Sequence, residues 1–226
     1  MSKQIKSQRK LITETNPSSP IAEQFKTLRA AIHFSSVERE YASILVTSPE
    51  PESGKSTVSA NLAICYAKQG EKTLLIDADM RKPTSHQTFG IPYNIGLSDM
   101  LTDSRTELKD VSHQTDIENL TVLTSGTMAP NPNELLASKK MEQLIKKFAE
   151  QFDQIIIDTP PILASSDALV LTPYVEGVIV VLRSEKTLKE RAKTAVMQLQ
   201  NTQVPIIGTV LNHVKNNANN YYYYYQ

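Results

Sequence analysis

The segment Ser48–Thr57 combines residue types that bind phosphate. It reads Ser-Pro-Glu-Pro-Glu-Ser-Gly-Lys-Ser-Thr, follows the apolar run Ile44–Val46 and precedes a helix-like segment. A strand, a tight turn and a helix N-terminus make an anion site, because free backbone N–H groups converge there with the positive end of the helix dipole. Lys55 would neutralise β- and γ-phosphates, and Ser56 would be a hydroxyl ligand for Mg²⁺. The predicted nucleotide-binding residues of this loop are Ser53, Gly54, Lys55, Ser56 and Thr57.

The same segment departs from the usual phosphate loop. Pro49 stands five residues before Gly54, where the pattern has a glycine, and Glu50 and Glu52 lie where phosphates should sit. A carboxylate that faces a triphosphate weakens binding unless it turns to solvent. We therefore predict that ATP binds more weakly to this chain than to a Glu52→Gly variant. Taken alone, Gly54–Thr57 is equally compatible with an ordinary surface turn.

Carboxylates follow two of the expected strands. Asp77 and Asp79 come at the end of Thr73–Ile76, and Asp158 follows Ile155–Ile157. With a cation nearby, at least one of Asp77 and Asp79 can bind Mg²⁺ while the other accepts a proton. Capping of local N–H groups is the alternative for both. Asp158 has the pattern of a Walker B aspartate and is a predicted Mg²⁺ ligand.

Arg81 and Asn212 could also take part in chemistry. Arg81 either holds a phosphate or pairs with Asp79, which lies two residues before it. Asn212 ends the last expected strand, where it either contacts adenine or caps a turn.

Unbroken apolar segments that alternate with helical segments predict the elements that position these residues. The chain has 226 residues, which suits an α/β domain with one core. Its apolar runs are typical of a mostly parallel sheet with helices on both faces, which binds ligands at the carboxyl ends of its strands. The predicted strands are 44–47, 73–76, 120–123, 155–158, 178–182 and 206–211, and the predicted helices are 20–34, 56–69, 96–101, 134–148 and 186–199.

The first predicted helix begins with Ser19 as N-cap and Pro20 in its first turn. Ile21, Phe25, Leu28 and Ile32 recur at helical spacing and are expected to be buried. Glu23, Lys26 and Arg29 lie on the same helix at three-residue spacing. By themselves they indicate a solvated face with a Glu23–Lys26 pair.

The composition of the chain limits the classes of partner that it is expected to bind. Lys plus Arg equals Asp plus Glu at 24 each, so the net charge indicates no attraction to nucleic acid or anionic lipid. The single cysteine, Cys65, excludes an intrachain disulfide. No signal peptide or membrane span is recognisable, so a cytoplasmic protein held at the membrane only by a partner is expected. We predict a flexible arm over residues 1–17, a domain over 18–214 and a flexible tail over 215–226.

Three motifs and the tail resemble the bacterial tyrosine kinases, a P-loop family unrelated to eukaryotic kinases. The motifs are Pro51–Thr57 (Walker A), Leu74–Pro83 (the family's A-prime motif) and Ile155–Pro161 (Walker B), and the tail carries the cluster Tyr221–Tyr225. The resemblance covers residues 18–226. The A-prime motif and the tyrosine cluster discriminate this family from other ATPases.

The resemblance implies an ATP- and Mg²⁺-dependent kinase of the P-loop fold shared with MinD and ParA proteins. Asp77 and Asp158 would help to hold Mg²⁺, and either Asp77 or Asp79 would be the base on the incoming tyrosine. The phosphoacceptors would be Tyr221, Tyr222, Tyr223, Tyr224 and Tyr225, modified in trans. The oligomerisation residues would be Glu23, Lys26 and Arg29, with Lys26 in place of the family's arginine.

The resemblance also implies a set of partners. They are a membrane adaptor whose cytosolic segment activates the kinase, further copies in a ring such as an octamer, a cognate tyrosine phosphatase and other protein substrates. It places the kinase in capsule or exopolysaccharide production. The alternative is a regulatory ATPase of the MinD/ParA type, although Glu50 occupies the position of that group's signature lysine. A scaffold that binds little nucleotide is a third alternative, and Glu52 alone favours it.

Overall fold

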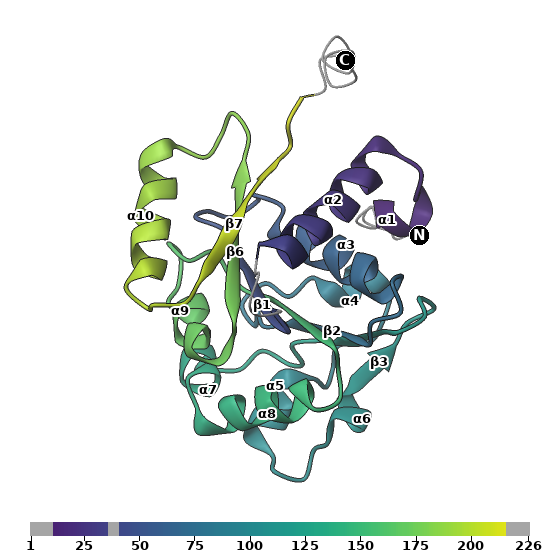
Figure 1. The fold of residues 1–226 in the computed structure, drawn as a ribbon. Coiled ribbons are helices and arrows are strands. Elements are labelled where there is room, and N and C mark those ends of the chain that lie inside the picture. The colour runs from purple at the N-terminus through teal and green to yellow at the C-terminus, as the bar shows by residue number, and fades with distance from the viewer. Residues whose placement is uncertain (1–10, 36–40, 216–226) are drawn as a thin grey trace, which may run out of the picture.

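The computed structural model describes residues 11–35 and 41–215. Their order along the chain is helices first, then strands that alternate with helices around one sheet (Figure 1). The strands are β1 (Ser43–Thr47), β2 (Thr73–Asp77), β3 (Ser112–Gln114), β4 (Leu120–Leu123), β5 (Gln154–Asp158), β6 (Gly177–Arg183) and β7 (Ile206–Asn212). The α-helices are α1 (Ile12–Thr15), α2 (Pro20–Phe34), α3 (Lys55–Ala67), α4 (Ser85–Phe89), α5 (Leu97–Thr102), α6 (Leu108–Val111), α7 (Pro132–Leu136), α8 (Lys139–Ala149), α9 (Asp167–Leu171) and α10 (Lys189–Gln200), with a 3₁₀ turn at Thr172–Tyr174.

The sheet has the strand order β3-β4-β2-β5-β1-β6-β7. All neighbouring strands are parallel except β3, which pairs antiparallel to β4 at one edge. The predicted fold class, a mostly parallel sheet, is confirmed. Because β5 lies between β1 and β2, the loop after β1 and the ends of β2 and β5 adjoin one another.

Burial of both sheet faces explains the unbroken apolar strands. In β1, Ile44 and Val46 pack with α2 and α3 on one face, while Leu45 joins the core on the other face. That second core includes residues of α5, α7, α8, α9 and α10. Alternate side chains of a strand point to opposite faces, so a strand covered on both sides is apolar throughout.

Helix α2 begins and ends where the sequence predicts. The Ser19 hydroxyl accepts a hydrogen bond from the Ala22 N–H, so Ser19 is the N-cap. The expected burial of Ile21 is wrong, since half of this side chain is exposed. Ile32 is buried as predicted, and Phe25 and Leu28 are partly buried against the same core, while Ala22 is buried in place of Ile21.

Two predicted helices differ from the structure. The segment predicted as one helix over 134–148 is α7 and α8, separated at Ser138. There the backbone is extended and the Ser138 hydroxyl caps α8 by accepting from the Met141 N–H. The helix predicted from residue 186 begins at Lys189, because Thr187 instead accepts a hydrogen bond from the Arg183 N–H.

The expected N-terminal arm is packed at its carboxyl end. Residues 1–10 lie outside the described residues, but α1 contacts α3. Thr13 is buried, and its N–H and hydroxyl both donate to Asn61 Oδ1, at 3.0 and 2.8 Å. Lys68 donates to the Thr13 carbonyl and pairs with Glu14. The sequence of this short turn carries no helical periodicity, so its contacts with α3 decide its structure.

Candidate nucleotide and magnesium site

The loop between β1 and α3 is closed by hydrogen bonds to one carbonyl. The hydroxyls of Ser48 and Ser53 donate to the Glu50 carbonyl at 2.7 and 2.9 Å. Gly54 then takes φ +89° immediately before the first residue of α3. This conformation favours glycine, and a Cβ on Gly54 would also lie 2.0 Å from Asn212 Nδ2. The loop therefore delivers Lys55 to the start of α3, as a phosphate loop does.

Lys55 lies between two carboxylates. Its Nζ is 3.0 Å from Asp79 Oδ2 and 3.8 Å from Asp158 Oδ1, and all three side chains are nearly buried. Burial works to lower the pKa of Lys55, but Asp158 and Asp79 outweigh it and the pKa is raised. Burial raises the pKa of Asp158 to about 6, against the opposite effect of Lys55. Lys55 is thus held charged at the start of α3, where a phosphate loop would bind phosphate.

Asp77 and Asp158 are brought together by strand register. They are direct partners in the β2–β5 pairing. With Ser56 and Ser59 they line a cavity of about 10 Å³, which matches a single water-sized occupant. Ala60, Leu75 and Phe89 also line the cavity, and its polar side chains supply only oxygen ligands, the hard ligands that Mg²⁺ prefers. The predicted Mg²⁺ ligands Ser56, Asp77 and Asp158 therefore fit the ion.

Among the described residues, no three His, Cys, Asp or Glu side chains make a metal site by themselves.

Asp77 and Asp79 differ in their surroundings. Asp77 Oδ2 accepts from the N–H groups of Thr84 and Ser85 and from the Ser85 hydroxyl, and Oδ1 accepts from the Asp79 N–H. Asp77 therefore also caps its turn, which was the alternative role considered for it. Asp79 Oδ1 likewise caps the turn by accepting from the Lys82 N–H, but its Oδ2 bonds Lys55, and Asp79 lines the larger pocket beside the loop.

The larger pocket has a volume of about 510 Å³. The loop and the first turn of α3 form one wall. The loops after β2 and β5 form the other, with Asp79, Arg81, Pro160, Pro161 and Ser165. The pocket is lined by Lys55, the predicted phosphate-binding cation, by Ser56, a predicted Mg²⁺ ligand, and by Asp79, a candidate base. Its chemistry suits an anionic ligand such as a nucleotide phosphate.

Arg81 does not pair with Asp79. Its Nε and Nη2 donate to the buried Asp167 at 2.7 and 3.1 Å. Asn133 Nδ2 also lies 3.3 Å from Asp167 Oδ1. Asp167 was not predicted from the sequence, because an aspartate at a helix start has no pattern that distinguishes it from a cap.

Asn212 holds the loop. Its Nδ2 donates to the Ser53 carbonyl at 3.0 Å, and its Oδ1 accepts from the His213 N–H. This side chain therefore contacts the nucleotide-binding loop, and its proposed contact with adenine stays a prediction.

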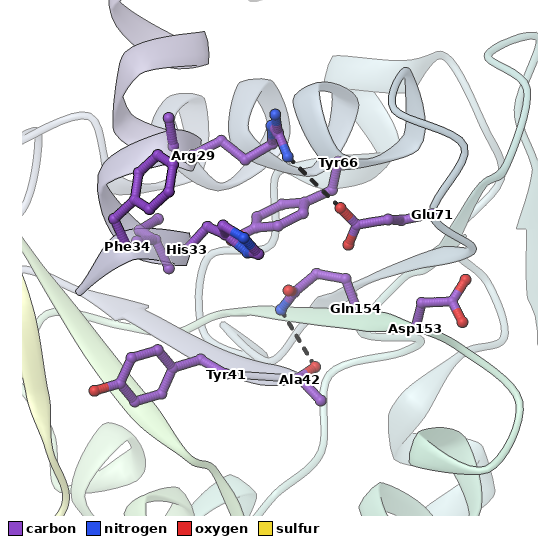
Figure 2. Close-up of a pocket in the computed structure, with 11 residues that line it drawn as sticks. Arg29, His33, Phe34, Tyr41, Ala42, Tyr66, Glu71, Asp153 and Gln154 are labelled. Carbon is purple, nitrogen blue, oxygen red and sulfur yellow. Dashed lines mark hydrogen bonds and ion pairs between the residues drawn. The ribbon is translucent and has the colours of Figure 1, made fainter. Parts of the chain in front are cut away.

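Glu23, Lys26 and Arg29 lie on α2. Glu23 and Lys26 form the expected pair at 2.7 Å, on an exposed surface. Arg29 lines a second pocket of about 460 Å³ at the amino ends of β1, β2 and β5, opposite to the nucleotide loop. Figure 2 shows its side chain extending past Tyr66 toward Glu71, whose carboxylate is 3.7 Å away. Tyr221–Tyr225 lie outside the described residues.

The fold and the loop define a P-loop nucleotide-binding protein. A family model described as the AAA domain matches residues 21–217. The solved MinD protein of Pyrococcus horikoshii, complexed with Mg-ADP, has a TM-score of 0.63 and 27% identity over 75% of this chain and 69% of that one. The shared architecture is that of the MinD-like P-loop proteins.

The relatives identify the group within that class. CapB of Staphylococcus aureus is 42% identical over 95% of this chain and 94% of its own length. The tyrosine-protein kinase YwqD of Bacillus subtilis (strain 168) is 41% identical over 96% of this chain and 92% of its own. The chimerical protein CapA2B2 has a TM-score of 0.88 and 39% identity, over 91% of this chain and 90% of that one. The chain belongs to the bacterial tyrosine-kinase family.

Proposed function

We propose that this protein is an ATP- and Mg²⁺-dependent protein-tyrosine kinase that phosphorylates Tyr221–Tyr225 on another copy of itself. It belongs to the capsule and exopolysaccharide type of its family, and we propose that it regulates capsule or exopolysaccharide synthesis. The observation that carries the proposal is the pocket beside the loop. There, Lys55 and a buried carboxylate, Asp79, lie 3.0 Å apart, with Asp158 beside them.

Nucleotide binding uses the loop. Backbone N–H groups of Ser53–Thr57 and the Lys55 ammonium bind the phosphates, and Asn212 contacts the adenine. Ser56, Asp77 and Asp158 hold Mg²⁺. When bound, Mg²⁺ supplies charge neutralisation to the transferring phosphoryl group. Positioning and charge neutralisation provide most of the rate, since phosphoryl transfer needs little covalent chemistry from the protein.

Asp79 is the better candidate for the base. Three protein donors already fill Asp77 Oδ2, whereas Oδ1 accepts only from the Asp79 N–H, so Asp77 keeps one acceptor position for the metal. Asp79 accepts from Lys55 and from the Lys82 N–H, and it lines the pocket in which a tyrosine would meet the nucleotide. The Asp79 carboxylate would take the phenol proton as the phosphoryl group is transferred, while Asp77 stays with the metal.

Assembly and location follow the family. Glu23, Lys26 and Arg29 make contacts between copies in a ring such as an octamer. A membrane adaptor activates the kinase and brings it to the cytoplasmic face of the membrane, and the similarity to the chimerical protein CapA2B2 supports such a partner. No helix within residues 11–35 and 41–215 has the length and hydrophobicity needed to cross a bilayer. A cognate tyrosine phosphatase and other protein substrates complete the proposed partners.

The test is incubation of the purified chain with Mg-ATP, with and without adaptor segments, followed by mass spectrometry of the tail. We expect phosphate on Tyr221–Tyr225 that is lost in Lys55→Met. Asp79→Asn should lower the rate by about 100-fold or more while Mg-ADP still binds. Asp77→Asn should instead raise the Mg²⁺ concentration that gives the half-maximal rate, because a metal ligand is lost.

Two outcomes would contradict the proposal. ATP hydrolysis without phosphotyrosine would support a regulatory ATPase of the MinD/ParA type. If the Asp77 and Asp79 variants lost the same fraction of the autophosphorylation rate and their Mg²⁺ dependence were unchanged, the two aspartates would not have the separate roles proposed for them.

A further inference from the structure

The last strand–helix–strand unit contacts the phosphate loop from outside the pocket through two arginines. Arg183, at the end of β6, places Nη1 at 3.3 Å from both the carbonyl and Oε2 of Glu52. Arg191, on α10, places Nε at 2.7 Å from Glu50 Oε1. The two glutamates that depart from the phosphate-loop pattern are therefore each paired with an arginine.

The same unit holds the next residue of the loop. Asn212, at the end of β7, donates to the Ser53 carbonyl directly before Gly54. Three of the four residues at positions 50–53 thus receive a side chain from β6, α10 or β7. The remaining one, Pro51, has its φ fixed by its own ring.

Glu52 needs such support for two reasons. Its φ is +60°, in the left-handed region that a residue with a side chain rarely adopts. Its side chain is 83% exposed and lines the pocket in which phosphates would bind. A free carboxylate there could turn toward the phosphates and repel them, so its orientation affects affinity.

We infer that Arg183 is a positioning residue for nucleotide binding, because it draws the Glu52 carboxylate away from the phosphate site. Arg191 and Asn212 support the same loop at Glu50 and Ser53. The inference rests on the proposed function only for the identity of the nucleotide, since binding of Mg-ADP is measurable without phosphotransfer.

The experiment is calorimetric titration of the full chain with Mg-ADP. Arg183→Gln should raise Kd about three- to tenfold, because the Glu52 charge is released near the phosphates. Arg183→Lys, which keeps the charge, should stay within about twofold of wild type. In a Glu52→Gln background, Arg183→Gln should change Kd by less than about twofold, because residue 52 then carries no charge that could repel the phosphates.

Lys193→Gln is the matched control, because it removes one exposed positive charge from α10 that pairs with Glu190 and lines neither pocket. Its Kd should equal that of wild type. In autophosphorylation assays, Arg183→Gln should raise KM for ATP in parallel with Kd and leave kcat within about twofold.

A Kd for Arg183→Gln within twofold of wild type would overturn the inference. So would an equal loss in the Glu52→Gln background, which would point to a general structural role. If Arg183→Gln does not fold, Arg183→Met provides a second neutral side chain for the same cycle. A chain that binds Mg-ADP as expected but forms no phosphotyrosine would contradict the proposed function and leave the role of Arg183 intact.

Discussion

Lys55 and three carboxylates set the charge of the site. Asp77, Asp79 and Asp158 bring three negative charges when ionised, and Lys55 brings one positive charge, so the group carries a formal charge of −2. A bound Mg²⁺ would neutralise that charge. Without bound Mg²⁺, burial of this net negative charge is costly, which explains why the pKa of Asp158 is raised.

The raised pKa of Asp158 predicts a pH dependence of stability without ligand. The folded-state pKa of about 6 lies above the unfolded value near 3.8, so the native state retains this proton longer. The associated stability is fully present below the unfolded value and is lost as pH rises through about 6. Asp158→Asn mimics the protonated form. Its free energy of unfolding, relative to that of wild type, should therefore increase by on the order of 1–3 kcal/mol between pH 4 and 7.

Urea unfolding of both chains, free of nucleotide and Mg²⁺, measures this difference across the pH range. A difference in unfolding free energy that is independent of pH would contradict the raised pKa of Asp158 in the folded protein.

Glu52 predicts a gain in affinity on substitution by glycine. Substitution by glycine removes a carboxylate from the pocket wall, and glycine adopts φ +60° without strain, so the loop can keep its conformation. Glu52→Gly should therefore bind Mg-ATP about two- to fivefold more tightly in calorimetry. Glu52→Gln removes the charge but keeps the side chain, so it should gain less. An affinity of the glycine variant no better than that of wild type would refute this expectation.

Helix α3 is the element that links the loop to the N-terminal segments. Eleven of its 13 residues are buried, because α1 and α2 cover it on one side and the sheet on the other. Asn61, in the middle of α3, accepts from Thr13 and donates to the Thr57 carbonyl. α1 is thereby joined to the turn of α3 that follows the phosphate loop.

Asn61→Ala should destabilise the protein by about 1–3 kcal/mol. The change leaves the buried Thr13 N–H and hydroxyl without their acceptor, and an unsatisfied buried donor costs this much. Urea unfolding at constant pH provides the value. Thr13→Val, which removes only the hydroxyl, is the control and should cost about 1 kcal/mol. A loss below about 0.5 kcal/mol for Asn61→Ala would show that α1 contributes little to stability.

The molecule places its two proposed functions at opposite ends of the sheet. The nucleotide loop and its aspartates lie at the carboxyl ends of β1, β2 and β5, and the pocket that contains Arg29 lies at their amino ends. The proposed contact between copies at α2 would therefore leave the pocket beside the nucleotide loop open. This arrangement suits an acceptor tail that comes from a neighbouring copy.

Phosphorylation in trans predicts transfer between two differently disabled chains. One chain carries Lys55→Met and keeps its tyrosines, and the other keeps Lys55 but has phenylalanine at positions 221–225. After mixing with Mg-ATP, mass spectrometry should find phosphate on the tyrosine tail of the Lys55→Met chain. Either chain alone should show none. If the mixture also stays unphosphorylated while wild type is modified, transfer occurs within one chain.

The sequence by itself determined the six parallel strands and the residues of the loop, because these depend on residues that are close together in the chain. It did not indicate the short antiparallel edge strand β3. Unbroken apolar runs indicate buried strands, and Gly54–Thr57 after such a run indicates a phosphate loop. Ser19 and Pro20 likewise determined the start of α2.

Tertiary structure decided which polar residues meet. Asp77 and Asp158 adjoin because of strand register, Arg81 pairs with Asp167 across 86 residues, and Arg183 reaches Glu52 across 131. Local patterns carry no information on such pairings, since they depend on how strands are ordered and how loops close. The same holds for α1, whose single turn is held by contacts with α3.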